Sequence, residues 1–332
     1  ASAMTSGISR LADARLAAGA AAIAGDAATL YHVVSGLMGD GVPFETVLFD
    51  VLVPAEREVG DRWQFGDFLV AEEHAATATL ETVVSLMAGA FDRPDDGPFL
   101  VVAAVAGDRH SLAGRVVAAH LLYLGHRTTF LGADVPAPDL YEYLELEPPS
   151  ALVLSAAMGD RLVAAREAVR VAHSIGVPVV VGGRAFGPKG EWARPVGADV
   201  WVSHPRRVAA VLDTWSPDPE RAERQAVDPS PGLVELMSLR SAVLAEAEGR
   251  LAPVPGEVRA RARDELSILL GSVEASLFVG DTRPTIETLA WQRTTLEAHG
   301  VTLADQIPGA LRDALRSLHP AGAEVLAAFD RT

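Results

Sequence analysis

The sequence predicts an α/β plus all-α architecture, in which a five-stranded parallel sheet lies between two helical regions. Three observations support this fold class. Residues 99–215 alternate short apolar runs with helical segments, a pattern typical of parallel strands joined by helical crossovers. Residues 8–92 are rich in alanine and place apolar residues at three- and four-residue spacing, which predicts helices. Residues 231–332 are again helical by this criterion.

Two linkers divide the chain into three expected domains. The segment DRPDDGP at 92–98 and the stretch 216–232 are both rich in proline and charge, as is typical of connecting segments. We therefore expect domains at residues 8–92, 98–215 and 231–332.

The strands and helices of each domain follow from the apolar pattern. The first domain has at least three helices, and continuous apolar strands in the second imply a sheet covered on both faces, for which five strands suit the flavodoxin/Rossmann-like order 2-1-3-4-5. We expect strands at 99–106, 127–132, 151–157, 177–183 and 198–203, with helices at 111–124, 137–146, 160–175 and 205–214. We expect C-terminal helices near 233–250, 255–279, 284–299 and 305–330, the last broken by Pro308 and Pro320.

Composition argues against several function classes. The 332 residues include no cysteine, so disulfides, thiolate metal sites and thioether attachment of a cofactor are excluded. The net charge of −16 argues against direct binding of nucleic acid, which needs a basic face. No apolar run is as long as a membrane span and no secretory signal is visible, so we expect a cytoplasmic protein with no membrane partner. No common catalytic motif is present, and we expect neither catalytic residues nor an enzyme.

One histidine stands where a parallel sheet would bind a ligand. The segment GDRHSLAG follows the first apolar run, so Asp108 and His110 lie at the carboxyl edge of the sheet. A carboxylate two residues before an imidazole can orient it as a metal ligand. No cluster of His, Asp and Glu accompanies it, as zinc would require, so a single imidazole suffices only if a macrocycle supplies the other ligands. A surface-loop histidine is the alternative.

A hydroxyl and a glycine pair share this edge. Ser155 ends the third expected strand, and Gly182 and Gly183 end the fourth. A hydroxyl beside a place without side chains suits a long nucleotide tail in a slot, although ordinary turn chemistry also explains each feature.

Together these residues resemble the cobalamin-binding Rossmann-like domain, whose motif is DxHxxG followed by SxL and GG. The resemblance implies that His110 is the lower cobalt ligand in place of the dimethylbenzimidazole base, and that the displaced tail passes Ser155 and the glycine pair. The motif glycine falls on Ala113, with Gly114 one residue later, and the SxL leucine is Ala157. The implied cofactor contacts in this domain are Asp108, His110, Ser111, Leu112, Ser155, Gly182 and Gly183.

The first domain carries a second signal. Trp63 is followed, after nine residues, by Glu73 and His74, which resembles the W-x9-EH motif of CarH-type cobalamin photoreceptors. In that family a four-helix bundle caps the upper face of the corrin. The resemblance implies that Trp63 packs on a 5′-deoxyadenosyl group, bordered by Val70, Glu73 and His74. A buried bundle tryptophan beside an exposed turn is the alternative.

One position departs from this pattern. In the family, a histidine directly after the tryptophan can bind cobalt once light removes the adenosyl group. Here that residue is Gln64, so ligation from this position is not expected.

The order of the three domains is similar to that of the photocobilins, which combine adenosylcobalamin with non-covalent biliverdin. The resemblance implies a bilin in the third domain, where arginines could pair with propionates and a tryptophan could line an apolar slot. A solvated, arginine-rich helix face is the alternative, and a haem site at His299 or His319 is a rival use. The candidate bilin residues are Arg259, Arg283, Trp291, Arg293 and His299.

We therefore expect a light-sensing protein that uses adenosylcobalamin and biliverdin, forms a homo-oligomer whose state changes with light, and has an unknown signalling partner. Two alternatives stay open. One is a corrinoid methyl-carrier protein of a methyltransferase system. The other is a light-independent cobalamin- or haem-sensing regulator that binds a transcription factor.

Overall fold

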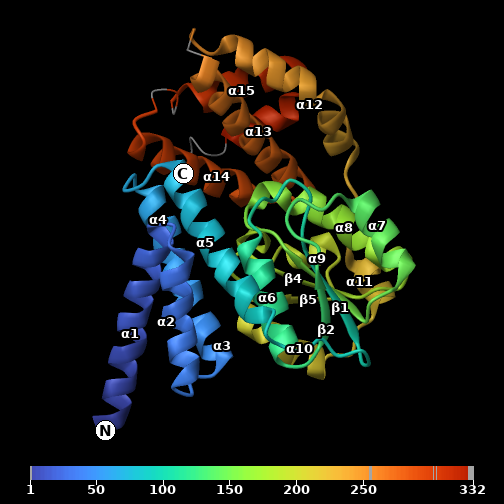
Figure 1. The fold of residues 1–332 in the computed structure, drawn as a ribbon. Coiled ribbons are helices and arrows are strands. Elements are labelled where there is room, and N and C mark those ends of the chain that lie inside the picture. The colour runs from blue at the N-terminus through green and yellow to red at the C-terminus, as the bar shows by residue number, and fades with distance from the viewer. Residues whose placement is uncertain (1, 254–255, 302, 304, 328–332) are drawn as a thin grey trace.

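The computed structural model describes residues 2–253, 256–301, 303 and 305–327. The middle of the chain forms a five-stranded parallel sheet. A helical bundle lies on one side of the sheet domain, and the C-terminal helices lie above both in the view of Figure 1. The strand order is β2-β1-β3-β4-β5, which confirms the order expected from the sequence. The strands are β1 (Phe99–Ala104), β2 (Arg127–Phe130), β3 (Ala151–Ser155), β4 (Val179–Gly182) and β5 (Val200–Val202).

Successive side chains of each strand point to opposite faces of the sheet, so each face has its own apolar core. On one face Val101 and Leu152 pack against α7 and α8; on the other, Leu100 and Val153 pack against α6 and α10. All six residues of β1 are buried, as expected for a central strand covered on both sides. These crossover helices are α6 (Leu112–Tyr123), α7 (Ala137–Leu146), α8 (Leu162–Ser174), α9 (Ala193–Val196) and α10 (Val208–Thr214).

The N-terminal bundle lies along α6. A single apolar core joins the bundle helices to Leu112, Val116 and Ala119 of α6. A π-helical segment at Leu48–Leu52 directly precedes α4. Pro54, which lacks an amide hydrogen, lies in the first turn of α4. The bundle helices are α1 (Ser2–Ile23), α2 (Ala27–Gly39), α3 (Phe44–Val47), α4 (Val53–Gln64) and α5 (Val70–Ala88).

The C-terminal helices form their own core and also pack on the sheet domain. Ala275 and Phe278 of α13 join the core on one face of the sheet, so this region is not a detached module. Among the described residues, no helix is both long and apolar enough to cross a membrane. The C-terminal helices are α12 (Pro231–Arg250), α13 (Gly256–Val279), α14 (Arg283–Ala298), α15 (Gln306–Leu318) and α16 (Pro320–Ala327).

Two expectations about secondary structure were wrong. Helix α11 (Pro219–Gln225) lies inside the expected linker, because Asp218 accepts from the Arg221 amide at 2.9 Å and caps it. The expected break at Pro308 is absent, because Pro308 sits in the first turn of α15, where proline is tolerated. The expected break at Pro320 is confirmed, since α16 begins there, and residues 328–330 lie outside the described part of the chain.

Candidate functional site

The loop after β1 presents His110 on a buried carboxylate. The chain turns at Gly107, whose φ is +76°, and the Asp108 side chain is only 2% exposed while that of His110 is 63% exposed. Asp108 Oδ1 accepts from the His110 amide at 2.9 Å and from imidazole Nδ1 at 2.7 Å. Its Oδ2 accepts from the Ala157 amide at 2.6 Å. The carboxylate thus fixes the ring, and Nε2 is the nitrogen left for a metal.

The two groups stabilise each other's charged forms. The hydrogen bond that the His110 imidazole donates to Asp108 is the main reason that the pKa of His110 lies above its usual value. Burial by itself would raise the pKa of Asp108, but hydrogen bonds from His110 and the Ala157 amide outweigh burial and leave that pKa lowered. Asp108 is therefore an ionised acceptor that can stay paired with an Nδ1–H imidazole.

Ser155 and the glycine pair lie together at the same edge. In the sheet register Ala104 pairs with Ser155, and Ser155 pairs with Gly182. The buried Oγ of Ser155 has no hydrogen-bond partner among the described residues. Gly183 has a φ of +110°, and a Cβ there would lie 2.1 Å from the Ala156 carbonyl oxygen. Only glycine fits at Gly183, and an unsatisfied hydroxyl stands beside it.

The residues that depart from the cobalamin motif have distinct surroundings. A Cβ at Gly114 would lie 2.8 Å from the Phe130 ring, so glycine is needed there for α6 to pack on the sheet. Ala113, on the motif's glycine position, is exposed. Ser111 Oγ donates to Glu81 of α5, and Leu112 is buried against the bundle. Ser111 and Leu112 thus join the sheet domain to the bundle in this structure.

The bundle residues of the motif lie on α4 and the start of α5. Glu73 Oε2 accepts from His74 Nδ1 at 2.6 Å, and Glu73 Oε1 accepts from Thr77 at 3.0 Å. His74 is 72% exposed and Val70, the first residue of α5, is also exposed. Trp63 is half-buried, yet its Nε1 is fully covered and has no acceptor among the described residues. An indole donor and a paired acid and imidazole are therefore available in this part of the bundle.

Two charged residues near the site were missed by the sequence analysis. Glu56 lies seven residues before Trp63 on the same face of α4. Burial raises the pKa of Glu56, and the charges of His110, Arg57 and Arg184 oppose that shift. Arg184 directly follows the glycine pair, and its positive charge opposes the rise in the pKa of His110. The seven-residue spacing from Trp63 was the signal that could have indicated Glu56.

A further acidic residue lies at the sheet edge. Asp160 follows β3 and is buried, which raises its pKa to about 6. One of its oxygens contacts Arg161 at 3.0 Å and the other has no partner among the described residues. The Arg161 guanidinium lies against Gly107, the turn that leads into Asp108. Arg161, paired with Asp160, therefore packs against the turn that precedes the His110 loop.

The five candidate bilin residues do not form one cluster. Trp291 and His299 pack on Trp63, with ring centroids 6.1 and 5.7 Å away. Arg259 is exposed near Glu248, and Arg293 is exposed beside Glu297.

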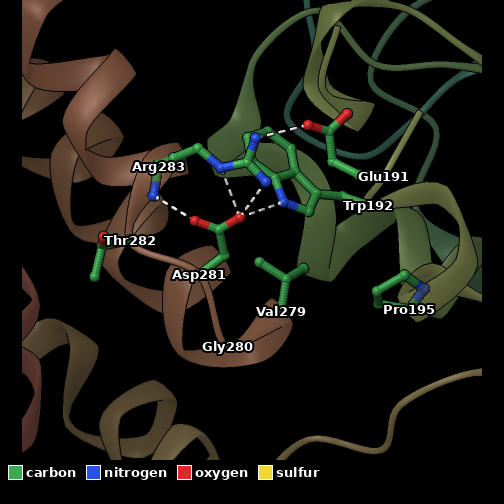
Figure 2. Close-up of a pocket in the computed structure, with 8 residues that line it drawn as sticks. All are labelled: Glu191, Trp192, Pro195, Val279, Gly280, Asp281, Thr282 and Arg283. Carbon is green, nitrogen blue, oxygen red and sulfur yellow. Dashed lines mark hydrogen bonds and ion pairs between the residues drawn. The ribbon is translucent and has the colours of Figure 1, made fainter. Parts of the chain in front are cut away.

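Arg283 lies elsewhere, at a surface pocket of about 500 Å³ between the sheet domain and α14 (Figure 2). It donates to Asp281 at 2.8 Å and to Glu191 at 2.7 Å, and it lies over the Trp192 ring. Both carboxylates raise its pKa. Because two acids already pair with Arg283, it is an interdomain contact in this structure and not an open propionate-binding cation.

The rival haem ligands are also engaged. His319 is buried and uses both ring nitrogens, one with the Gly232 carbonyl at 2.9 Å and one as acceptor from the Gly322 amide at 3.1 Å. His299 Nε2 donates to the Trp63 carbonyl at 2.8 Å. Among the described residues, no group of three or more His, Cys, Asp and Glu side chains forms a metal site.

Comparison with protein families identifies two segments. A model described as B12 binding domain matches residues 99–212, and a second model with the same description matches residues 17–87. The Asp108 and His110 loop falls in the first segment, and Trp63, Glu73 and His74 fall in the second.

Two related proteins match part of the chain. The HTH-type transcriptional repressor CarH of Myxococcus xanthus is 34% identical over 147 residues, which are 41% of this chain and 46% of that protein. The repressor CarA of the same organism is 34% identical over 104 residues, 31% of this chain and 34% of CarA. The chain thus aligns with less than half the length of either repressor.

The fold also resembles a solved structure. The monomethylamine corrinoid protein of Methanosarcina barkeri superposes with a TM-score of 0.51 at 18% identity, covering 59% of this chain and 95% of that one. At this identity the likeness concerns the fold.

Proposed function

We propose that this chain, which is a cobalamin-binding protein by its two B12 binding domains, holds adenosylcobalamin and works as a light sensor. In this proposal the cofactor lies between the bundle and the carboxyl edge of the sheet. His110 would hold the cobalt through Nε2, and Trp63 would contact the adenosyl group.

The observation that carries the proposal is the imidazole held by a buried carboxylate. Asp108 has both oxygens occupied by His110 and the backbone, so His110 is oriented before any ligand arrives. A single protein imidazole is sufficient for a corrin, because the macrocycle supplies the other ligands of cobalt. Ser155, with its unpartnered hydroxyl, and Gly183, where no side chain fits, suit the displaced tail.

The adenosyl form is supported by the bundle. A bare cobalt face needs no aromatic cover, whereas an adenosyl group offers a flat base and a ribose with hydroxyls. The covered but unpartnered Nε1 of Trp63 and the Glu73–His74 pair match that chemistry. Trp63, Glu73 and His74 lie within the segment that matches a B12 binding domain at residues 17–87.

The output follows from the loss of a ligand. Adenosylcobalamin, when bound, would supply a light-sensitive cobalt–carbon bond. Trp63, Glu73 and His74 would hold the adenosyl group, and loss of these contacts would bias the bundle toward another arrangement. We propose that this changes the homo-oligomeric state and that an unidentified signalling partner reads the change, with no enzymatic step in the chain itself.

Biliverdin in the C-terminal helices is a separate part of the proposal. It is supported by the resemblance in domain order alone. Titration of the purified protein with biliverdin tests it, because binding would add absorbance in the red.

The central experiment is illumination of the protein reconstituted with adenosylcobalamin in the dark. We expect green light to change both the absorption spectrum and the elution volume on size exclusion. An identical spectrum and size before and after light would refute light sensing. Equal affinity for methylcobalamin and adenosylcobalamin, without a light effect on size, would instead favour a methyl carrier.

A further inference from the structure

Helix α14 is fixed at its N-terminal end to the sheet domain. Arg283, its first residue, donates to Glu191 at 2.7 Å, across 92 residues of sequence. The next residue, Pro284, packs on Gly159, where a Cβ would be in van der Waals contact with the proline side chain at 3.4 Å. Gly159 follows β3, at the same edge of the sheet as His110.

The other end of α14 is fixed to the bundle, at the motif tryptophan. His299 caps α14, and its Nε2 donates to the Trp63 carbonyl at 2.8 Å. Gly66, with a φ of +85°, lies so near that a Cβ would be 2.6 Å from the Ala298 carbonyl oxygen. The rings of His299 and Trp291 flank the Trp63 ring. The C-terminal ends of α4 and α14 are thus joined through Trp63.

The helix between these two ends is firmly packed. Thr285, Thr288 and Leu296 are buried, and Gln292 Nε2 donates to the Glu265 carbonyl of α13 at 2.8 Å. Sixteen residues of α-helix span about 24 Å, and Figure 1 shows α14 running between the end of α4 and the sheet domain. A helix held along its length transmits position between its ends.

We infer that α14 is a strut that sets the position of Trp63 relative to the sheet edge, and that His299 is a positioning residue for the upper face of the cofactor. This inference rests on the proposed function, since it assigns Trp63 to that face. His299 contacts the backbone and the ring of Trp63, so we assign it a role through Trp63. Its effect is therefore on the choice of upper ligand, and the lower face around His110 is unaffected.

The test compares two ligands that differ only above the corrin. Dissociation constants for adenosylcobalamin and hydroxocobalamin are measured in the dark for the wild-type protein, His299→Ala, His299→Gln and Glu287→Ala. We expect His299→Ala to weaken adenosylcobalamin binding about five- to tenfold, the cost of one hydrogen bond, and to change hydroxocobalamin binding less than about twofold. The glutamine amide can still donate, so His299→Gln retains most of the preference. Glu287, exposed on the same helix and assigned no binding role, is the matched control.

Three outcomes overturn the inference. They are equal weakening of both ligands by His299→Ala, no change in either, and no difference between the alanine and glutamine variants. If His299→Ala fails to fold by thermal denaturation, Trp291→Leu is used instead. It removes only a ring contact with Trp63, and the same selective loss is expected. A wild-type protein that binds no cobalamin would refute the proposed function itself, whereas a light-sensitive wild type with an unaffected preference in every variant refutes the strut alone.

Discussion

Asp108 holds His110 and the end of the third strand at the same time. Its Oδ1 accepts from the His110 imidazole at 2.7 Å, while its Oδ2 accepts from the amide of Ala157, 49 residues away. Because both oxygens are used and the carboxylate is buried, the ring cannot turn without losing a charged hydrogen bond. The direction of the imidazole is therefore fixed by the fold of the sheet edge.

This relationship predicts that Asp108→Asn weakens cobalamin binding even though residue 110 is still a histidine. An amide cannot accept from both donors through two oxygens, so the ring loses its orientation. Loss of such a partner lowers metal affinity about 10- to 100-fold. Spectroscopic titration with hydroxocobalamin measures the change. Asp96→Asn, in the exposed linker, should bind like the wild type, and an Asp108→Asn protein of unaltered affinity would contradict the role given to the carboxylate.

Gly183 predicts a loss of stability larger than backbone strain alone. Gly176→Ala places alanine at a φ of +76° with nothing within 4 Å, so it costs about 1–2 kcal/mol in conformational strain. Gly183→Ala adds a Cβ that would lie 2.1 Å from the Ala156 carbonyl oxygen, and its cost should be at least about 1 kcal/mol greater. Urea denaturation of both variants measures the difference. Equal urea midpoints for the two variants would contradict this prediction, because the backbone after β4 would then accommodate the added Cβ with no further loss of stability.

The order of the sheet was predictable from local sequence. Continuous apolar strands separated by helical segments permit few arrangements, and the observed order β2-β1-β3-β4-β5 is the expected one. The same logic placed Asp108, Ser155 and Gly182 at one edge, because parallel strands end together, and the register brings them together. These conclusions depend on periodicity and chain direction, both of which are present in a single sequence.

Contacts between distant segments were not predictable in this way. His299 and Trp63 are 236 residues apart, and no local pattern encodes their pairing. Arg283 was assigned to a bilin propionate because it lies on the same predicted helix as Trp291, but Glu191, 92 residues away, already accepts from it. Helix α11 was missed because a stretch rich in proline and charge is also typical of a linker, although Asp218 caps the helix locally. Its contacts through Glu223 with Arg166 and His173 depend on the tertiary structure.

Gln64 predicts a gain of function. It directly follows Trp63, at the position where the resembling photoreceptors carry a histidine. We expect Gln64→His to supply an imidazole that binds cobalt once the adenosyl group has left. The illuminated variant should then show an altered absorption spectrum and slower exchange of added ligands such as cyanide. The spectrum in the dark should match that of the wild type. If light yields the same product in both proteins, residue 64 does not reach the cobalt.

The last prediction concerns pH and a buried histidine away from the cofactor. His173 of α8 contacts Asp199 at 2.7 Å through Nε2 and Glu223 of α11 at 3.1 Å through Nδ1. Burial lowers the pKa of His173, but the hydrogen bonds to these two carboxylates outweigh burial and leave the pKa above 6.5. Two carboxylates can both accept only when both ring nitrogens carry protons. The charged form of His173 is therefore the stabilising one.

A raised pKa in the folded state fixes the direction of the effect. The stabilisation is fully present below the unfolded pKa of 6.5 and is lost as pH rises through the folded value. Compared with His173→Gln, the wild type should be more stable by about 1–3 kcal/mol at low pH, and the gap should shrink as pH rises. Urea denaturation across pH 5.5–9, with the exposed His32→Gln as control, measures it. A gap that widens toward alkaline pH would mean that neutral His173 is the stabilising form and that the two carboxylates do not hold α11 in place through its charge.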